Sequence, residues 1–496
     1  MMLKELIKGL NITEILGNPN CDVRGVTQDS RKVQKGFLFA ALPGQERDGH
    51  QFIAQALKKG ALALIVSEKK ALIQSESVTQ VLVDNSRRAL AQVSARFYGN
   101  PSEKMTVIGI TGTNGKTTLT FLLESILEEA GRRPAVLGTI NYRFGGKTTP
   151  AENTTPESVD LQSLLAEMLA AGATDVVMEV SSHSLVMERV HEVQFDVAAF
   201  TNLSQDHLDF HGDLEKYFQA KLKLFTDFLP ASRKKDKFAV LNMEEMRSES
   251  IRAAVLPKSI KFARTGLTGP YEISARSFQL SPDGIVAQIV AGSDSFEIRS
   301  RLLGKFNLEN ILVAIGIARC LGLDHDVISR GIEKVRLVPG RLEKIENQKG
   351  FLVFVDYAHT PQALAAVGAN IRKFSRGRII TVFGCGGDRD RTKRPLMGRE
   401  AALFSDFILV TSDNPRNEDP EAIIEEILPG IDEVGFPRER VSQVVSRQEA
   451  LEQAVKLARR GDLILVAGKG HEDYQIVKGQ KVHFSDQEIL KELLTS

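Results

Sequence analysis

Short apolar segments alternate with amphipathic ones along the first hundred residues, which predicts a mixture of strands and helices. Residues 36–41 and 61–66 are compact apolar runs of the length of buried strands. Residues 86–98 carry apolar side chains at helical spacing. Gly99, Asn100 and Pro101 then interrupt the pattern, as turn residues do. We therefore predict a first domain over residues 1–100.

The same alternation continues over residues 101–335, the second predicted domain. Its strands are predicted at 105–110, 175–180, 197–201 and 238–242, and its helices at 117–130, 156–171 and 308–321. Thr155 is the predicted N-cap of the middle helix, and Pro156 suits the first helical position. Strands that alternate with helices favour a mainly parallel sheet. From 271 to 303 the period falls to two, which predicts an antiparallel hairpin that turns at 281–284.

The turn at Val338, Pro339 and Gly340 lies near the start of the third predicted domain, residues 336–496. Strands are predicted at 351–355, 378–383, 407–411 and 463–467, and several of them run into polar loops. Ligands of open α/β sheets bind at the carboxyl ends of the strands, where loop donors and helix N-termini converge. The predicted fold class is therefore α/β. At about 150 residues per domain, a chain of 496 residues accommodates three domains.

The positive and negative charges of the chain are nearly balanced, which bears on whether nucleic acid is an expected partner. The chain has 64 Lys and Arg against 63 Asp and Glu, a formal net charge of +1, which gives no reason to expect a nucleic-acid partner. No apolar run approaches the roughly 20 residues of a membrane-spanning helix. The amino-terminal segment lacks the apolar core of a signal peptide, and the three cysteines form no CxxC pair. We expect a soluble, cytoplasmic, monomeric protein.

The segment TGTNGKTT follows the strand at 105–110 and begins the helix at 117–130. Glycines there let successive backbone N–H groups turn toward phosphate oxygens, and the helix N-terminus adds positive partial charge. Lys116 would reach the outer phosphates of ATP, and the hydroxyl of Thr117 would bind Mg²⁺. Ile110 stands where the strict phosphate-loop pattern has its first glycine. The ATP-binding residues predicted in this loop are Gly112, Thr113, Asn114, Gly115, Lys116, Thr117 and Thr118.

Two other strand ends carry candidate metal ligands. Glu179 ends the strand at 175–180, and His207 follows the strand at 197–201. Oxygen ligands suit Mg²⁺, whereas histidine is a less usual ligand for it. Taken singly, each residue is as well explained by an ordinary structural role. Lys221, in the segment YFQAKLKLF, has the pattern of a solvated helix lysine.

The runs TGTNGKTT, MEVSSHSLVMERV, TNLSQDHLDFHG and YFQAKLKLF together resemble the Mur ligase family, and matches extend into both flanks. That family couples ATP cleavage to amide formation on UDP-linked muramoyl precursors of peptidoglycan. The resemblance implies three domains, with a central P-loop parallel-sheet ATPase domain and a Rossmann-like carboxyl-terminal domain. It also implies that Lys221 reacts with CO₂ to become N6-carboxylysine. The implied metal ligands are Thr117, Glu179, His207 and the Lys221 carbamate, and the implied catalytic residues are Lys116, Lys221 and His207.

The run DNPR, residues 413–416, narrows the implied substrate. It resembles the signature of family members that add meso-2,6-diaminopimelate, whereas lysine-adding members carry a tetrad without the arginine. Diaminopimelate has a second amino-acid head, and an arginine can hold its carboxylate through two N–H bonds. The implied reaction adds meso-2,6-diaminopimelate to UDP-MurNAc-L-Ala-D-Glu through an acyl phosphate. The diaminopimelate contacts implied by resemblance are Arg389, Asp413, Asn414, Pro415, Arg416, Gly468 and Glu472.

The resemblance also assigns residues to the other two substrates. Further ATP contacts are Asn310, Arg341 and Asp356. The last two lie in the third domain, so the site should be completed when that domain closes on the second. Met187 stands where some relatives have glutamine and is not assigned. The implied contacts of the UDP-linked precursor are Ser30, Gln45, Glu46, Arg47, Asn153, Thr154, Thr155, Ser181 and Arg189.

Three other functions remain open from the sequence. A lysine-adding ligase would share every motif except DNPR. A folylpolyglutamate synthetase would share the phosphate loop, although the amino-terminal domain and DNPR argue against it. A regulatory P-loop ATPase would bind nucleotide without making an amide. No side chain stands out as the general base for the attacking amine.

Overall fold

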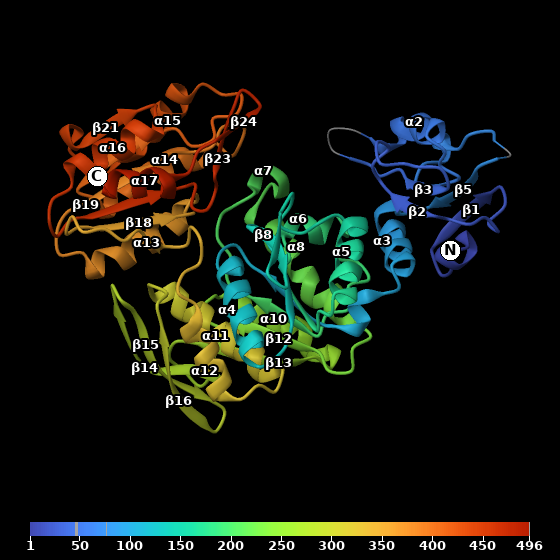
Figure 1. Cartoon of the computed structure of the whole chain (residues 1–496), viewed down its shortest axis with the longest axis horizontal. Helices are drawn as coiled ribbons and strands as arrows, with labels where there is room; N and C mark the ends of the chain where they lie inside the picture. Colours follow the sequence, from blue (N-terminus) through green and yellow to red (C-terminus); the bar gives the residue numbers. More distant parts are fainter. Residues whose placement is uncertain (45–47, 76, 496) are drawn as a thin grey trace.

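The computed structural model describes residues 1–44, 48–75 and 77–495 and consists of three α/β units that follow one another along the chain (Figure 1). The amino-terminal unit (blue) and the carboxyl-terminal unit (red) lie on opposite sides above the central unit. Each unit has its own sheet. The predicted α/β fold class is confirmed.

The amino-terminal unit is built on a five-stranded sheet of order β1-β5-β4-β3-β2, in which only β1 is antiparallel. The predicted strands at 36–41 and 61–66 and the helix at 86–98 are confirmed. The side chain of Asn85 caps that helix by accepting from Arg88 N. The elements are β1 (Ile12–Leu16), β2 (Gly25–Thr27), β3 (Phe37–Ala40), β4 (Ala63–Val66), β5 (Thr79–Val83), α1 (Leu3–Leu6), α2 (Ile53–Lys58) and α3 (Ser86–Phe97).

The central unit carries an eleven-stranded sheet of order β16-β15-β14-β13-β12-β11-β6-β10-β7-β8-β9. Strands from β7 through β14 in this order run parallel, as predicted, and both ends of the sheet are antiparallel. The strands are β6 (Thr106–Thr111), β7 (Pro134–Leu137), β8 (Asn141–Phe144), β9 (Lys147–Pro150), β10 (Asp175–Glu179), β11 (Val197–Phe200), β12 (Phe238–Asn242), β13 (Lys261–Gly266), β14 (Ile273–Ser281), β15 (Gly284–Ala291) and β16 (Asp294–Ser300).

Two details of the central unit differ from prediction. The expected single hairpin at 271–303 is a three-stranded meander, because 294–300 alternates buried and exposed positions and pairs with β15. The expected cap of the helix at 156–171 is wrong, since α5 begins at Ser158 and has no side-chain cap. Thr155 instead donates its hydroxyl proton to the backbone oxygen of Glu179 at 2.8 Å. Tertiary contact with β10 therefore replaces the local capping bond.

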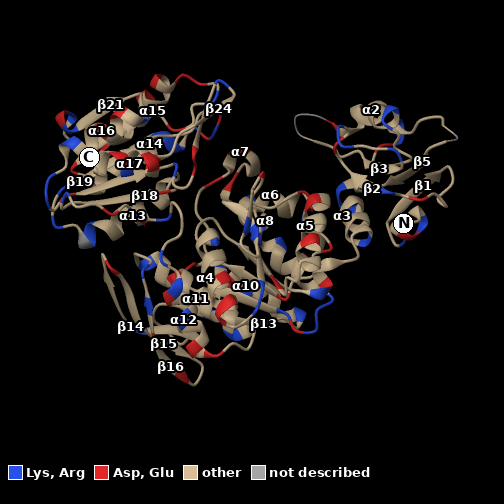
Figure 2. Ribbon diagram, in the orientation of Figure 1, with Lys and Arg blue, Asp and Glu red and all other residues tan. Residues whose placement is uncertain are grey.

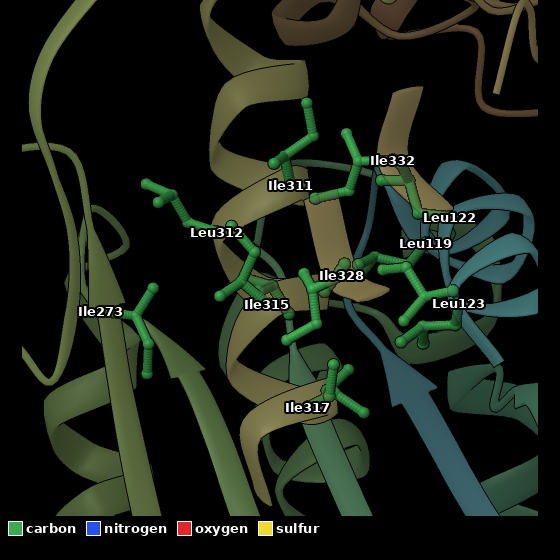
Figure 3. Close-up of a cluster of buried hydrophobic side chains, with 14 of the residues drawn as sticks. Leu119, Leu122, Leu123, Ile273, Ile311, Leu312, Ile315, Ile317, Ile328 and Ile332 are labelled. Atoms are coloured by element: carbon green, nitrogen blue, oxygen red, sulfur yellow. The ribbon is translucent and has the colours of Figure 1, made fainter. Parts of the chain in front are cut away.

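Helices cover both faces of the central sheet. On one face, leucines of α4 pack against isoleucines of α11 and α12, and Ile273 of β14 lies on the other side of α11 in the same buried cluster (Figure 3). Burying each such side chain contributes about 1.5–3 kcal/mol, which fixes α4 and hence the loop that precedes it. The helices are α4 (Lys116–Glu129), α5 (Ser158–Ala170), α6 (Ser182–Val186), α7 (Leu208–His211), α8 (Leu214–Lys223), α9 (Leu229–Ala231), α10 (Arg247–Val255), α11 (Lys305–Cys320) and α12 (His325–Lys334).

The carboxyl-terminal unit has a six-stranded sheet of order β17-β18-β22-β19-β20-β21, parallel except for β17. The four predicted strands are confirmed. Because they run parallel, their polar loops gather at one edge of the sheet. The strands are β17 (Glu343–Lys344), β18 (Leu352–Asp356), β19 (Ile379–Phe383), β20 (Phe407–Thr411), β21 (Val441–Val444), β22 (Leu463–Ala467) and the separate pair β23 (Tyr474–Val477) and β24 (Gln480–His483). The helices are α13 (Pro361–Phe374), α14 (Lys393–Phe404), α15 (Pro420–Glu433), α16 (Arg447–Leu457) and α17 (Asp486–Thr495).

Charged side chains of both signs are intermixed over all three units in this view (Figure 2), in keeping with the formal net charge of +1. Among the described residues, no helix is both long enough and apolar enough to cross a membrane.

Candidate active site

The loop between β6 and α4, residues 112–115 and here called the cradle, leads directly into the N-terminus of α4. Gly112 and Gly115 have φ angles of 144° and 88°, which other residues rarely adopt. A Cβ atom at Gly112 would overlap Thr201 Oγ1. The Nζ of Lys116 donates to the carbonyl oxygens of Gly112 and Thr113 at 3.0 and 2.8 Å. Together with the N-terminus of α4, this arrangement suits phosphate oxygens.

The loop after β11 supports this cradle. The backbone N–H of Thr113 donates to the oxygen of Asn202 at 2.9 Å, and that of Asn114 donates to Asn202 Oδ1 at 2.9 Å. Thr117 and Thr118 are buried in the first turn of α4. The predicted phosphate-loop residues, 112–118, therefore lie together as one preformed element.

Glu179 ends β10 beside the cradle and is 1% exposed. Its Oε1 accepts from Thr117 Oγ1 at 3.0 Å and from Thr139 N at 2.9 Å, and its Oε2 accepts from Thr139 Oγ1 at 2.9 Å. A Cβ at Gly138 would crowd Glu179 Oε1 at 2.6 Å. The carboxylate is therefore fixed next to the hydroxyl of Thr117, as two of the predicted metal ligands should be.

Lys221 is 1% exposed, so its interpretation as a solvated helix lysine is wrong. Its Nζ donates to the oxygen of Gly112 at 2.8 Å and lies 4.3 Å from the ring centre of Tyr217. Burial, with repulsion from Lys116, holds the pKa of the Lys221 amine well below its usual range. An amine that sheds its proton in this way can act as a nucleophile. The sequence held a signal for this burial, because Lys221 shares a helical stripe with Tyr217, Phe218 and Leu224.

His207 stands at the start of α7 with a φ of 54°. Desolvation lowers its pKa to about 4, and the nearby cations Lys221 and Lys116 act in the same direction, against the Asp206 carboxylate. The imidazole is therefore neutral at pH 7, the form that binds metals. The ring of His183 packs edge-on to it with centroids 4.9 Å apart. The structure thus brings His207 near the phosphate loop and Lys221.

A cavity of about 290 Å³ opens from the cradle toward the carboxyl-terminal unit. Asn310 of α11 lines it together with Arg341 and Asp356 of the third unit, so the three further ATP residues share one cavity. Arg341 Nη2 donates to Thr117 Oγ1 at 3.2 Å and its guanidinium stacks 4.8 Å from the Tyr357 ring centre. Burial raises the pKa of Asp356 to about 6. Side chains of two units already meet at this cavity.

A second cavity, of about 200 Å³, lies on the other side of Tyr357. Asp206, His207 and Asp209 of the central unit form part of its wall. Six of the seven residues predicted to bind the amino acid also line it, namely Arg389, Asp413, Asn414, Arg416, Gly468 and Glu472. Pro415 is buried behind it, where its backbone oxygen packs against Gly387.

Arg416 is held in the second cavity by backbone contacts. It has a φ of 54°, and its backbone N–H donates to Ile476 O at 2.9 Å, which ties it to β23. Its Nη1 donates to the oxygen of Gly387 at 2.8 Å. A Cβ at Gly386 would lie 2.9 Å from Nη1 and 3.8 Å from Arg389, so this glycine admits both arginines. Nη1 also donates to Asn414 O at 3.4 Å, and among the described residues Nε and Nη2 have no hydrogen-bond partner, which leaves them able to hold a carboxylate.

Glu472 lines the same cavity as Arg416 and is held by residues near the end of β22 and β20. Lys469 is fully buried, and its Nζ lies 3.1 Å from Glu472 Oε2 and 3.4 Å from Asn414 Oδ1. Asn414 Nδ2 also donates to Glu472 Oε2 at 2.8 Å. Gly468 has a φ of 112°, and a Cβ there would lie 2.6 Å from Asp413 Oδ2. The cavity therefore pairs a cationic side with an oriented carboxylate.

Several residues predicted for the nucleotide precursor gather behind Glu179. Arg189 Nη1 donates to the oxygen of Thr155 at 3.1 Å, and Ser181 Oγ accepts from Ser184 N at 3.1 Å at the start of α6. Thr154 Oγ1 lies 3.1 Å from Thr139 Oγ1.

The remaining precursor residues are more scattered. Asn153 is exposed beside Thr154. Ser30 lies in the amino-terminal unit and donates to Gln55 Oε1 at 2.7 Å. An ion pair of 3.7 Å between Lys32 and Asp160 brings the Ser30 loop to α5. Gln45, Glu46 and Arg47 lie outside the described residues.

Comparison with known proteins decides the family. Models of the Mur ligase family catalytic domain, the Mur ligase middle domain and the Mur ligase, glutamate ligase domain match residues 22–98, 110–318 and 340–470. A UDP-N-acetylmuramoyl-L-alanyl-D-glutamate--2,6-diaminopimelate ligase of Geobacter metallireducens is 46% identical over 98% of this chain and 97% of its own length. The chain belongs to the Mur ligase family.

Other relatives agree with this placement. A protein of Aquifex aeolicus with the same name is 41% identical over 95% of this chain and 94% of its own. A solved UDP-N-acetylmuramoyl-L-alanyl-D-glutamate--2,6-diaminopimelate ligase is similar with a TM-score of 0.71 at 32% identity, over 100% of this chain and 99% of that one. A folylpolyglutamate synthase of Mycobacterium tuberculosis shares only the fold, with a TM-score of 0.62 at 21% identity over 76% of this chain and 91% of that one.

Sequence reasoning missed several residues of this Mur ligase site. Thr139 follows β7, a strand that was not predicted, so it carried no signal. Tyr357 and His359 lie in the first three residues after β18, and Lys469 is the second residue after β22, so strand-end position would have found all three. Met187 Sδ lies 3.5 Å from Arg189 Nη2, which sets this unassigned residue beside the precursor contacts.

Proposed function

We propose that this Mur ligase joins meso-2,6-diaminopimelate to UDP-MurNAc-L-Ala-D-Glu and converts ATP to ADP and phosphate. The observation that carries the proposal is the pair of adjoining cavities on either side of Tyr357. One adjoins the phosphate loop, and the other offers Arg389, Arg416 and an oriented Glu472. We infer domain boundaries near residues 100 and 335. We also propose that the enzyme is a monomer. Its location would be the cytoplasm, since its substrates are nucleotides and a free amino acid.

The chemistry of the side chains fits Mg²⁺. Thr117 and Glu179 supply oxygen donors, and His207 is neutral. The lone pair of the Lys221 amine would attack the carbon of CO₂, form an N–C bond and release a proton. A buried cation would become an anion beside Lys116. Bound Mg²⁺ would neutralise charge on the transferred phosphoryl group.

In the first step the protein positions the two substrates and neutralises charge on the phosphates of ATP. The γ-carboxylate of the D-glutamyl residue attacks the γ-phosphorus of ATP, its oxygen forms a new P–O bond, and ADP leaves. The backbone amides of the cradle and Lys116 hold the phosphates, as in other phosphoryl transfers. Arg341, which reaches the cradle from the third unit, helps to close the site around the acyl phosphate. Exclusion of water protects this intermediate from hydrolysis.

The second step joins the amino acid to this intermediate. Arg416 holds the distal carboxylate of diaminopimelate and Glu472 its distal ammonium. The other amine attacks the acyl carbon, and the tetrahedral intermediate collapses to amide and phosphate. A lysine-adding ligase would leave Arg416 without a partner, which costs binding energy. A folylpolyglutamate synthetase would have no use for DNPR.

Phosphate release tests the proposal against a regulatory ATPase. The purified protein is expected to hydrolyse ATP at a substantial rate only when both UDP-MurNAc-L-Ala-D-Glu and meso-diaminopimelate are present, because the acyl phosphate and the amine are both needed for turnover. Phosphate should be measured with each substrate omitted in turn, and the product identified by mass. Equal phosphate release without either substrate would contradict the ligase function.

A further inference from the structure

His359 enters the second cavity from the loop after β18 with a defined tautomer. Its Nδ1 lies 2.7 Å from the backbone oxygen of Tyr357. A carbonyl oxygen only accepts hydrogen bonds, so Nδ1 carries the proton and Nε2 carries the lone pair. Nε2 lies 3.9 Å from Asp206 Oδ2 of the central unit, and the side chain is 36% exposed. An unprotonated nitrogen therefore faces the cavity where the two units meet.

The charges around the cavity set the direction of the bound amino acid. Arg416 and Glu472, on the carboxyl-terminal unit, hold the distal head in the proposed function. The reacting head then faces the wall from the central unit, where Asp206 and Asp209 attract its ammonium group. His359 stands at this wall. This step rests on the proposed function.

An amine must lose a proton before it can attack. At neutral pH the α-amino group of a free amino acid is an ammonium ion, which has no lone pair. We propose that His359 is the catalytic residue that removes this proton, with Nε2 as the acceptor and Asp206 beside the imidazolium that results.

One proton moves from the ammonium nitrogen to Nε2, and the freed lone pair forms the C–N bond to the acyl carbon. The C–O bond to the phosphate then breaks, and the phosphate leaves with that electron pair. The second proton on the new amide nitrogen passes to the phosphate or to water. His359 returns its proton to solvent before the next turnover.

The groups around the ring favour the neutral imidazole at rest. Desolvation lowers the pKa of His359, and the nearby cations Lys393 and Arg341 lower it further, against the carboxylate of Asp206. Lys393 of α14 also donates to the backbone oxygen of His359 at 2.9 Å, which fixes this loop. The charged or titratable groups that surround the ring are Asp206, His207, Arg341, Tyr357, Lys393 and His471.

The variant His359→Asn can distinguish a role of His359 as a base from a purely structural role. The asparagine amide can still donate to Tyr357 O in place of Nδ1, but it has no group in place of Nε2. Hydroxylamine serves as a second nucleophile, because it is already unprotonated at neutral pH and needs no base to attack an acyl phosphate. We expect the variant to lose on the order of 10²–10⁴-fold in kcat with diaminopimelate. Hydroxamate formation from UDP-MurNAc-L-Ala-D-Glu, ATP and hydroxylamine should stay within about threefold of wild type.

His325→Asn, at a histidine on α12 with a 40% exposed side chain, is the matched control and should keep both activities. The residual diaminopimelate activity of His359→Asn should rise with pH, as solvent takes over deprotonation. Equal loss of amide and hydroxamate formation would overturn the proposal, and so would an undiminished kcat with diaminopimelate. If wild type forms hydroxamate but no diaminopimelate adduct, the proposed function fails instead.

Discussion

Lys221→Ala is expected to lower ligase activity by roughly 10³-fold, the scale of losing one preorganised charge-stabilising group. A short carboxylic acid such as acetate should restore part of the activity. The reason is the burial of Lys221 beside Gly112 and Lys116. The proposed carbamate would supply a negative charge that alanine cannot, and the space left by the side chain would admit a small carboxylate. Product formation with increasing acetate measures both effects.

Lys216→Ala provides a matched control for this experiment. Lys216 lies on the same helix, α8, but its side chain is 71% exposed. The control should keep wild-type activity and show no response to acetate. The thermal unfolding midpoint of each variant shows whether it has folded. A folded Lys221→Ala enzyme with full activity in the absence of acid would contradict the carbamate role.

Arg416→Ala is expected to lower kcat/KM for meso-diaminopimelate on the order of 10²–10³-fold, or about 3–4 kcal/mol, as is typical when one partner of a buried charge pair is removed. KM for ATP and for the nucleotide precursor should change little, because both bind elsewhere. The kcat/KM of Arg416→Lys for meso-diaminopimelate should lie between those of wild type and Arg416→Ala, since an ammonium cannot make two parallel bonds to a carboxylate. Steady-state kinetics with each substrate varied in turn provide the measurement.

Arg399→Ala is the control for Arg416. Arg399 lies on α14 of the same unit, its side chain is 45% exposed and its ion pair to Glu433 spans 3.7 Å. An exposed pair of this kind contributes little to stability, so the variant should resemble wild type. If Arg416→Ala used diaminopimelate with unchanged kinetics, Arg416 would have no place in the amino-acid site.

Local sequence patterns predicted half of the 24 strands that the structure describes, because buried strands are short apolar runs whatever their neighbours are. They did not predict the order of strands within a sheet. β22 lies between β18 and β19, and this placement brings the loop of Gly468 next to Asp413. That order depends on contacts between residues far apart in sequence. The failed N-cap at Thr155 has the same cause, since its hydroxyl bonds to β10.

Some residues of the candidate site could likewise be predicted from the sequence, and others could not. The phosphate loop could be predicted because one continuous segment supplies the cradle and the lysine. Lys221, by contrast, became a plausible carbamate site only through family resemblance, and its chemistry follows from burial produced by α8 packing on the loop. Thr139 and Lys469 act by holding Glu179 and Glu472 in place. The Thr139 contact joins two separate segments and leaves no motif in either one, whereas Lys469 lies three residues before Glu472 in the same loop.

A competition between amino acids tests the central claim most directly. The wild-type enzyme, ATP and UDP-MurNAc-L-Ala-D-Glu should be incubated with equal concentrations of meso-diaminopimelate, lysine and ornithine, and the products resolved by mass. Because lysine and ornithine lack the distal carboxylate that Arg416 would hold, the diaminopimelate adduct should exceed the others by on the order of 10²-fold or more. A lysine or ornithine adduct in equal or greater amount would contradict the assignment.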